Sequence, residues 1–495
     1  MTSEGPTPTP NRTCTGLART PDCRAARPLS LGRVAARTVK RPKSATIRGV
    51  FQPTAAGIAL AAELVIALCA TWHFNDRSIV MEDLGLRALY RRVAGVDVHR
   101  MLHVVTVLIE QADGSMQRHT REFGGFRRDC RALAAWLGEL GVELVVMEST
   151  GIYWKSVHAH LENAGITAWV VNAHMIKHVP GRKTDMADSE WLAVLARFGL
   201  VRASFIPPKD LRELRLVSRY RRKLSAMCAS ELNRLHKILD DGGIKLGGVV
   251  SDINGVSARA MVSALIEGQS IEHMLGLARG RLKQKCADLS ASLEGDLSAR
   301  HLFVLGHIQA HIETLRCELT EIDAYLLAAM QPYAWAHQLL QTIPGIDEIA
   351  AAMILIEIGD DMARFASPAR LACWAALSPG NNESAGKRKS GRTRHGNSII
   401  RFILCECANA ARMTKSTLAS KYKSLMVRKS HKKAIIAVAH KMIRLIYILL
   451  SRRQAYIDQA IDYAAMSAKK NAPRWMKQLK AIGRWPSSKP AAASA

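Results

Sequence analysis

The feature that most constrains the fold of this chain is a set of acidic residues placed in or after apolar, strand-like runs. Asp97 lies inside the run 93–98, and Glu148 directly follows the run 144–147. A carboxylate within an apolar strand is costly unless positive charge compensates it. Folding alone does not require acids at these positions, so the pattern indicates a functional site.

Two further acids, Asp185 and Asp188, lie three residues apart at the start of a predicted helix and therefore share one helix face. Because Asp is common in the first turn of a helix, capping or surface roles are the alternative for this pair. Four converging carboxylates would form an oxygen-lined site for Mg²⁺, which prefers hard ligands and usually keeps waters and substrate phosphates. Together, Asp97, Glu148, Asp185 and Asp188 favour a nuclease-type metal site.

The order of elements around these acids predicts a ribonuclease-H-like α/β fold. Alternating and β-branched runs predict strands, and periodic apolar segments predict helices. In chain order these are strands 93–98, 101–109 and 116–123, helix 127–140, strand 143–147, helix 153–164, strand 167–172 and a helix from about 186 to 198. In such a sheet the first and fourth strands are neighbours, so Asp97 and Glu148 would lie side by side.

Composition and periodicity divide the chain into five segments. These are a disordered or atypical N-terminal extension (1–88), the α/β catalytic domain (89–206), a helical linker (207–335), a mostly helical C-terminal domain (336–460) and a basic tail (461–495). Within the extension, the apolar stretch 55–72 is at the lower limit for a membrane span. A sequence pattern typical of a globular domain begins only after Met81. We therefore expect the natural start codon to lie downstream of the codon for Met1.

The linker contains two long helical patterns. The first runs from Leu211 to about Leu239, and the second carries apolar residues that alternate by three and four positions, as in a coiled coil: Leu305, Ile308, Ile312, Leu315, Leu319 and Ile322. The partner of this seam is either the first helix, in a plain helical hairpin, or another chain. The sequence leaves both arrangements open.

The charge balance indicates a polyanionic partner. Lys and Arg number 70 against 42 Asp and Glu, a formal net charge of +28. The basic residues lie throughout the chain without a confident membrane span, which favours nucleic acid over a membrane, and the apolar helix 435–450 is expected to be core. With only 5% aromatic residues, phosphate contacts should outweigh base stacking. The ten cysteines contain no CxxC pair and indicate reduced, buried thiols of a cytoplasmic protein.

A polar, glycine-punctuated loop at 377–397 carries a second chemical group. Ser384 lies beside a cluster of cations that should contact phosphates: Lys387, Arg388, Lys389, Arg392 and Arg394. A hydroxyl among cations could attack phosphorus in a stabilised transition state. The alternative is a flexible basic loop whose serines serve only turn geometry. Upstream, Ile343-Pro-Gly-Ile346 resembles the turn of a helix-hairpin-helix module, whose backbone amides hold a DNA phosphate.

Five motifs occur in an order that resembles the DEDD transposases of the IS110 insertion-sequence family, in its eleven-eleven subgroup. They are Gly95-Val-Asp-Val-His99, Met147-Glu-Ser-Thr-Gly-Ile-Tyr153, Lys183-Thr-Asp-Met-Ala-Asp188, Ile343-Pro-Gly-Ile346 and Asn382-Glu-Ser-Ala-Gly386. The resemblance covers roughly residues 90–460. It implies a RuvC-like N-terminal domain, a helical linker and a C-terminal domain with a catalytic serine.

By the same resemblance, the four acids would hold Mg²⁺ and Ser384 would be the nucleophile. Members of this family excise and insert their own element, guided by a structured RNA, as dimers that pair into tetramers on donor and target DNA. The resemblance therefore implies a bacterial cytoplasmic, nucleoid-associated recombinase without a membrane partner. A Holliday-junction-type, structure-selective endonuclease is the second hypothesis, since it would need the acids but no serine. A non-enzymatic DNA- or RNA-binding protein is the third, and the four acids argue against it.

Overall fold

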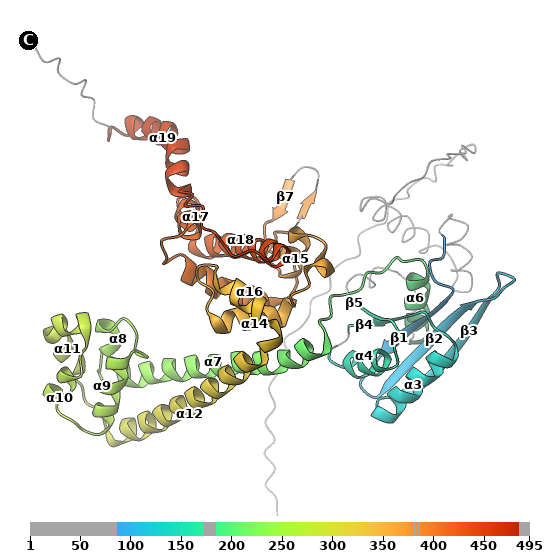
Figure 1. Cartoon of the computed structure of the whole chain (residues 1–495). Helices are drawn as coiled ribbons and strands as arrows, with labels where there is room; N and C mark the ends of the chain where they lie inside the picture. The colour runs from blue at the N-terminus through green and yellow to red at the C-terminus, as the bar shows by residue number, and fades with distance from the viewer. Residues whose placement is uncertain (1–86, 150, 173–184, 381, 385–386, 485–495) are drawn as a thin grey trace, which may run out of the picture. The chain divides into compact units, whose positions relative to one another are not determined.

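The computed structural model describes residues 87–149, 151–172, 185–380, 382–384 and 387–484, without the side chains at 185–187, 382–384 and 387–389 (Figure 1). Every described residue belongs to one compact unit, Ile66–Ala495. The predicted extension 1–88, with its apolar stretch at 55–72, lies outside the described residues except for its last two.

A five-stranded sheet forms the N-terminal part of the described chain. Its strands are β1 (Arg92–Val98), β2 (Leu102–Glu110), β3 (Met116–Gly124), β4 (Leu144–Glu148) and β5 (Ala168–Val171). Their order in the sheet is β3-β2-β1-β4-β5. β1 pairs antiparallel with β2 and parallel with β4, and β4 pairs parallel with β5. The predicted neighbourhood of the first and fourth strands is therefore confirmed.

Helices cover both faces of this sheet, and the alternation along β1 determines which face each helix covers. Ala94, Val96 and Val98 form one core with Leu133 of α3 (Arg127–Glu139) and Leu161 of α4 (Trp154–Asn163). Residues at alternate positions of a strand face opposite sides. Gly95 accordingly faces α6 (Asp185–Arg197), whose backbone lies directly against it. The result is a mixed α/β domain, as predicted, with helices on both faces of the sheet.

Two long helices follow the sheet domain and pack against each other within the chain. They are α7 (Lys209–Asp241) and α12 (Ala299–Ala329). The predicted seam residues of α12 lie in one core with α7: Leu305, Ile308, Ile312 and Leu315 with Leu224, Leu235 and Leu239. This is the arrangement of a helical hairpin, and a coiled coil between chains stays a prediction. Between them lie short helices that the sequence did not reveal: α8 (Leu246–Val249), α9 (Val256–Ile266), α10 (Ile271–Gly276), η2 (Gly280–Lys285) and α11 (Cys286–Leu293).

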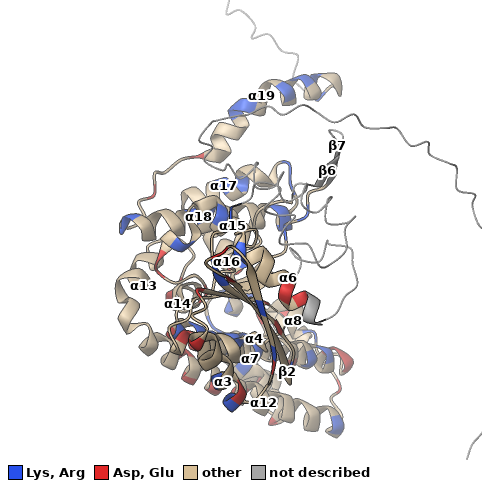
Figure 2. Ribbon diagram, turned by 90° about the vertical axis from the view of Figure 1, so that its right-hand side faces the viewer, with Lys and Arg blue, Asp and Glu red and all other residues tan. Residues whose placement is uncertain are grey.

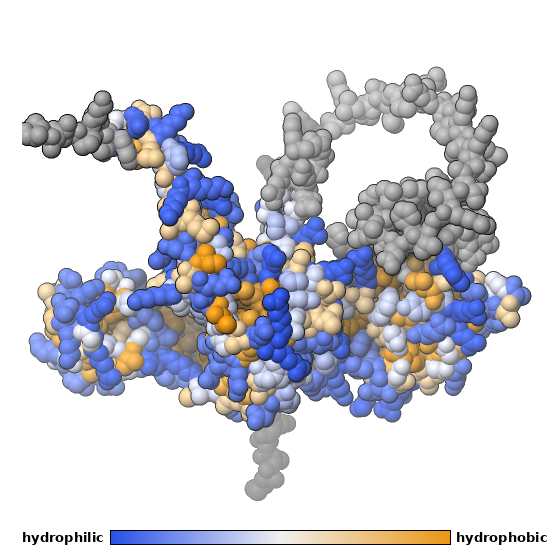
Figure 3. Space-filling view, turned by 45° about the horizontal axis from the view of Figure 1, so that its top comes forward, coloured by the Kyte–Doolittle hydropathy of each residue, from blue (hydrophilic) through white to orange (hydrophobic). Residues whose placement is uncertain are grey.

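The C-terminal domain is mostly helical and has its own core. It comprises η3 (Gln331–Tyr333), α13 (Ala334–Gln341), α14 (Glu348–Ile358), η4 (Met362–Phe365), α15 (Pro368–Trp374), α16 (Ser398–Ala411), α17 (Thr417–Met426) and α18 (His431–Arg452), with a hairpin of β6 (Asn382–Ser384) and β7 (Lys387–Ser390). A last helix, α19 (Tyr463–Ala481), has no buried residue. Across the face in view in Figure 3, hydrophobic patches are interrupted by larger hydrophilic areas.

Helix α18 is the one helix in the described part of the chain that is long and apolar enough to cross a membrane. It is nevertheless a core helix, because Val438, Met442, Ile443 and Ile446 are fully buried in the C-terminal core. This confirms the prediction that residues 435–450 are core. Among the described cysteines, all free, Cys130, Cys228 and Cys407 are buried as predicted, but Cys286 and Cys317 are exposed. The expectation of buried thiols was wrong for these two, which lie on outer faces of the linker helices.

Candidate active site

Asp97 is held near the end of β1 by the burial of its strand. The four residues directly before it in β1, all apolar or glycine, are buried, and Asp97 itself is only 8% exposed. One carboxylate oxygen, Oδ2, lies 3.2 Å from Nε2 of the half-exposed His99. A nearby imidazole can offset part of the cost of burying the carboxylate, most strongly when it is protonated.

Glu148 lies next to Asp97 because of the parallel register of β1 and β4. Val96 pairs with Met147, so Asp97 and Glu148 are each one residue beyond a paired position. Neighbouring strands lie about 4.8 Å apart, and equivalent positions of paired strands face the same side of a sheet. Glu148 is the last residue of β4 and is partly exposed. The predicted pair of acids at the carboxyl edge of the sheet is thus brought together.

Helix α6 brings the other two acidic positions to the same edge. A Cβ on Gly95 would lie 2.0 Å from the Ser189 backbone oxygen, so α6 crosses β1 on the face that Gly95 shares with Asp97. Thr106, which pairs with Gly95, shares a 2.8 Å hydrogen bond between its Oγ1 and Ser189 Oγ. At the other end of α6, the Arg197 backbone oxygen accepts from the Leu89 amide, just before β1.

These contacts show that α6 runs antiparallel to β1, with its first turn toward the end of β1. Position 185 is one helical turn before Ser189, about 6 Å along the axis, and Asp97 is about 6.6 Å beyond Gly95 along the strand. Asp188 is partly buried next to Ser189, whereas the side chain of Asp185 lies outside the described residues. Figure 2 shows acidic positions in red near the start of α6.

The donor set fits a hard divalent cation. All of the candidate ligands are carboxylates, which Mg²⁺ prefers over nitrogen or sulfur. Among the side chains that the structure describes, no group of three or more His, Cys, Asp or Glu could hold a metal ion. Asp97, Glu148 and Asp188 therefore do not form such a group by themselves. The side chain of Asp185, one helical turn before Ser189, is not among the described side chains.

Ser384 lies on a separate hairpin rather than in the predicted loop. It ends β6 and pairs with Lys387, while Glu383 pairs with Arg388. The base of the hairpin is fixed by the Gly380 amide, which donates to the Arg392 backbone oxygen at 2.8 Å, and by the Arg394 amide, which donates to that of Ser378 at 3.2 Å. The side chains of Ser384, Lys387, Arg388 and Lys389 lie outside the described residues, and those of Arg392 and Arg394 are exposed.

A buried polar network anchors the end of this segment. Asn397 caps α16 by accepting from the amides of Ile399 and Ile400, and its side-chain amide donates to Glu357 Oε2 at 2.7 Å. Glu357 is fully buried in α14 and also pairs with Arg215 at 3.2 Å and Arg219 at 3.1 Å, both from α7. Burial lowers the pKa of Arg215 to about 10, despite the neighbouring Glu357.

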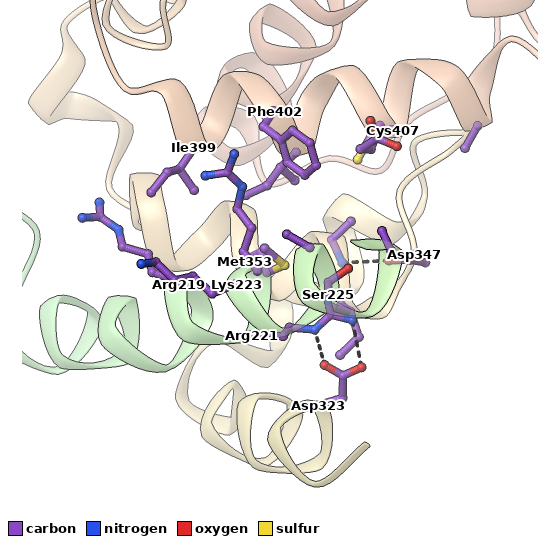
Figure 4. A pocket seen from close by; sticks show the side chains of 18 of the residues that line it. Arg219, Arg221, Lys223, Ser225, Asp323, Asp347, Met353, Ile399, Phe402 and Cys407 are labelled. Carbon is purple, nitrogen blue, oxygen red and sulfur yellow. Dashed lines mark hydrogen bonds and ion pairs between the residues drawn. The ribbon is translucent and has the colours of Figure 1, made fainter. Parts of the chain in front are cut away.

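An open cleft of about 1170 Å³ lies between α7, α14 and α16 (Figure 4). Its lining includes Arg222, whose guanidinium lies 4.5 Å from the ring centroid of the exposed Phe402, and Arg221, which forms a bidentate pair with Asp323. Lys223 adds a further cation, and Asp347 and Glu406 add acids. The mixture of charges does not select one ligand class.

The Pro-Gly turn at residues 344–345 joins α13 to α14, as a helix-hairpin-helix module would. Gly345 has φ +87°, and a Cβ there would meet the backbone of α16, 2.5 Å from the Cys407 oxygen. The Asp347 carboxylate caps α14 by accepting from the Ala350 amide at 2.7 Å. Close packing against α16 thus explains the glycine at this position. Because an acid already occupies the start of α14, a phosphate contact here stays a prediction.

The sequence places Gly95 and His99 in a motif around Asp97 but assigns no role to either of them or to Ser189. A glycine within an otherwise apolar strand is a recognised signal of close backbone approach, and it could have indicated the packing of α6. The contact between Thr106 and Ser189 joins residues 83 positions apart. No local pattern in the sequence signals such a contact.

Comparisons with known proteins identify two segments of the chain. Residues 94–243 match the DEDD transposase family of IS110, and residues 337–423 match the transposase family IS116/IS110/IS902. A family 20 transposase of Pseudomonas aeruginosa is 23% identical over 63% of this chain and 85% of its own length. The transposase for insertion sequence element IS1111A of Coxiella burnetii is 29% identical over 65% of this chain and 81% of its own length.

Other similarities are shorter. A protein of Sinorhizobium fredii described as a transposase is 28% identical over 40% of this chain, and this chain spans about half (52%) of its length. Among solved structures, RuvC of Thermus thermophilus aligns over 23% of this chain and 99% of its own, at 15% identity and a TM-score of 0.20. Both matched segments are thus similar to transposases of the IS110 type.

Proposed function

We propose that this transposase-family enzyme excises and inserts an insertion-sequence element by cutting and rejoining DNA strands, guided by a structured RNA. The observation that carries the proposal is the meeting of Asp97 and Glu148 at one sheet edge, with the first turn of α6 packed over the same face. Carboxylates gathered at one edge are the ligands that metal-dependent phosphoryl transfer needs.

Asp97, Glu148, Asp185 and Asp188 are the residues that would hold Mg²⁺. When bound, this ion supplies positive charge at the scissile phosphate and favours the ionised form of a nucleophile. The position of Asp97 near the end of the strand keeps its carboxylate in a fixed direction, because its backbone pairs with Val104 of β2 and the preceding Val96 pairs with Met147 of β4. His99 orients the same carboxylate through the 3.2 Å contact to Oδ2.

Ser384 would be the nucleophile. Its Oγ attacks the phosphorus of the scissile phosphodiester, a new Oγ–P bond forms, and the bond from phosphorus to one deoxyribose oxygen breaks. That oxygen leaves as a strand-end hydroxyl after taking up a proton. A hydroxyl of another strand then attacks the phosphoserine and releases the serine, so strand joining needs no external energy source.

The partners of this reaction are DNA ends, target DNA and a structured guide RNA. Lys387, Arg388, Lys389, Arg392 and Arg394 would bind their phosphates, because each cation on a phosphate releases a counterion. The active assembly would be a dimer that pairs into a tetramer on DNA, working in the bacterial cytoplasm. A structure-selective endonuclease is the second candidate, since the acidic edge alone would support hydrolysis by water.

The test is strand cleavage with the purified chain, DNA carrying the element ends, RNA transcribed from the adjacent noncoding DNA, and Mg²⁺. Asp97→Asn should lower cleavage at least about 100-fold, because metal-held stabilisation is worth several kcal/mol, while folding and DNA binding persist. Asp188→Asn should act alike; a much milder effect would give Asp188 a supporting role. Glu139→Gln, at an exposed acid of α3, is the matched control. Normal cleavage by folded Asp97→Asn would contradict the assignment.

A further inference from the structure

The last helix of the described chain, α19, carries basic residues without any acidic one. The helix Tyr463–Ala481 contains no Asp or Glu, and its cations are Lys469, Lys470, Arg474, Lys477 and Lys480. Figure 2 shows the corresponding blue positions along α19. The helix also lies beyond residue 423, where the second family match ends. Its role therefore belongs to neither matched segment.

The cations lie on one face of the helix. At about 100° per residue, all five fall within a sector of about 140° of a regular helix, and Pro473, which lies inside the helix between Lys470 and Arg474, falls in the same sector. The opposite sector holds four alanines with Trp475 and Leu479, together with the uncharged Asn471 and Gln478. Like charges on one helix face repel each other and destabilise an isolated helix. An anionic partner that runs along these cations reduces the repulsion between them.

Only the first turn of α19 is attached to the rest of the domain. Asp462 caps the helix through the amides of Ala464 and Ala465, and it accepts a 2.9 Å hydrogen bond from Ser420 of α17. Tyr463 accepts from Lys441 Nζ of α18 at 3.2 Å. Beyond this turn no residue is buried, and within the described residues none of the five cations forms an ion pair. The first turn thus attaches α19 to α17 and α18, and the basic face beyond it is exposed.

We infer that α19 is a second DNA-binding element, whose basic face contacts the phosphates of duplex DNA outside the cleavage site. The major groove of B-DNA admits an α-helix, so cations spread over 140° can reach phosphates on its walls. The major groove of A-form RNA is too narrow for this. A membrane is a poorer match, because interfacial helices bury larger apolar side chains than alanine. The inference rests on the proposed function only in taking DNA as the substrate.

The experiment compares two full-length triple variants with the unmutated protein. Lys470→Gln/Arg474→Gln/Lys477→Gln removes three cations from α19. Arg279→Gln/Arg281→Gln/Lys283→Gln removes three exposed cations near η2 and changes the net charge equally. Binding of a 30-base-pair duplex DNA of arbitrary sequence, a duplex RNA and vesicles of anionic phospholipid is measured over a series of salt concentrations. Because α19 buries nothing, circular dichroism and melting temperature should be unchanged by its variant.

The α19 variant should bind duplex DNA more weakly, and its slope of log K against log salt should fall by about 2.7, or 0.9 per lost phosphate contact. The η2 variant should keep the slope. An equal loss in both variants, or a loss confined to RNA or vesicles, would overturn the inference. Cleavage is scored separately: a reduced slope without cleavage by the unmutated protein would refute the proposed function and leave this inference standing.

Discussion

Gly95 sets how closely α6 can approach the sheet, because a Cβ at this position would lie 2.0 Å from the Ser189 backbone oxygen and 2.6 Å from the Ala193 amide nitrogen. Both atoms belong to the helix backbone and cannot move aside alone. Gly95→Ala should therefore displace α6, lower stability by about 1–3 kcal/mol and reduce cleavage strongly. Denaturant unfolding and the cleavage assay measure the two effects.

Gly138→Ala is the control for this substitution. Gly138 lies within α3, with nothing within 4 Å of an added Cβ, and alanine favours a helix by up to about 1 kcal/mol. It should keep or raise stability and leave cleavage unchanged. A fully stable and active Gly95→Ala protein would show that α6 does not need its close approach to position the acids.

Two buried histidines should make the sheet domain sensitive to acid. Burial lowers the pKa of His103, which is 2% exposed, and of His158, which is 9% exposed. Both are more basic in the unfolded chain, where the pKa is about 6.5. Below that pH the unfolded state binds more protons, so stability should fall as pH drops from about 6.5 toward the folded-state pKa.

This dependence is measured from denaturant midpoints between pH 7.5 and 5. The double variant His103→Gln/His158→Gln should lose less stability over this range than the unmutated protein, even if it is less stable at pH 7.5. Equal slopes in the two proteins would assign the acid sensitivity to other groups.

Single residues also show how far the sequence could predict the site. Asp97 and Glu148 stood out because a carboxylate in or after an apolar strand has no structural reason to be there. His99 did not, because a histidine after a strand is unremarkable until its ring is found 3.2 Å from the Asp97 carboxylate. Pairings of this kind depend on rotamers, which no sequence pattern encodes.

At the scale of elements, the junction of α7, α14 and α16 depends on Glu357. This residue is fully buried between Arg215, Arg219 and Asn397. Glu357→Gln keeps the shape but leaves the arginines without a countercharge, which should lower stability by about 3 kcal/mol. Because Asn397 closes the segment that carries Ser384, strand exchange should fall as well.

Glu348→Gln, at an exposed acid in the first turn of the same helix, is the control and should cost less than about 1 kcal/mol. Unfolding followed by circular dichroism, with the exchange assay alongside, separates the two variants. If Glu357→Gln were as stable as its control, the network would not hold the junction together.

Elements were predictable where their pattern is local. The strands and helices of the sheet domain follow from alternation, from the apolar period and from the turn at Asp113 and Gly114, where Gly114 has φ +83°. The sequence predicts a loop where the structure has the β6–β7 hairpin, because polar and cationic residues are poor signals of a strand. The short helices α8 to α11 escaped prediction because no strong period marks segments of four to eleven residues.

At the scale of the whole molecule, the acidic edge and Ser384 belong to segments of the chain that have separate hydrophobic cores. How the two groups meet on DNA is a property of the assembly, and sequence patterns within one chain do not encode it. The central claim is therefore that one reaction uses both groups, and it is tested at the phosphoserine.

The most direct measurement traps the reaction with suicide DNA substrates and looks for a denaturation-resistant protein–DNA adduct in the presence of the RNA and Mg²⁺. We predict an adduct for the unmutated protein and for Ser390→Ala, the serine at the end of β7. Ser384→Ala should give no adduct and no strand exchange while still binding DNA and RNA. An adduct that persists in Ser384→Ala, or efficient hydrolytic cleavage without any adduct in the unmutated protein, would contradict the account.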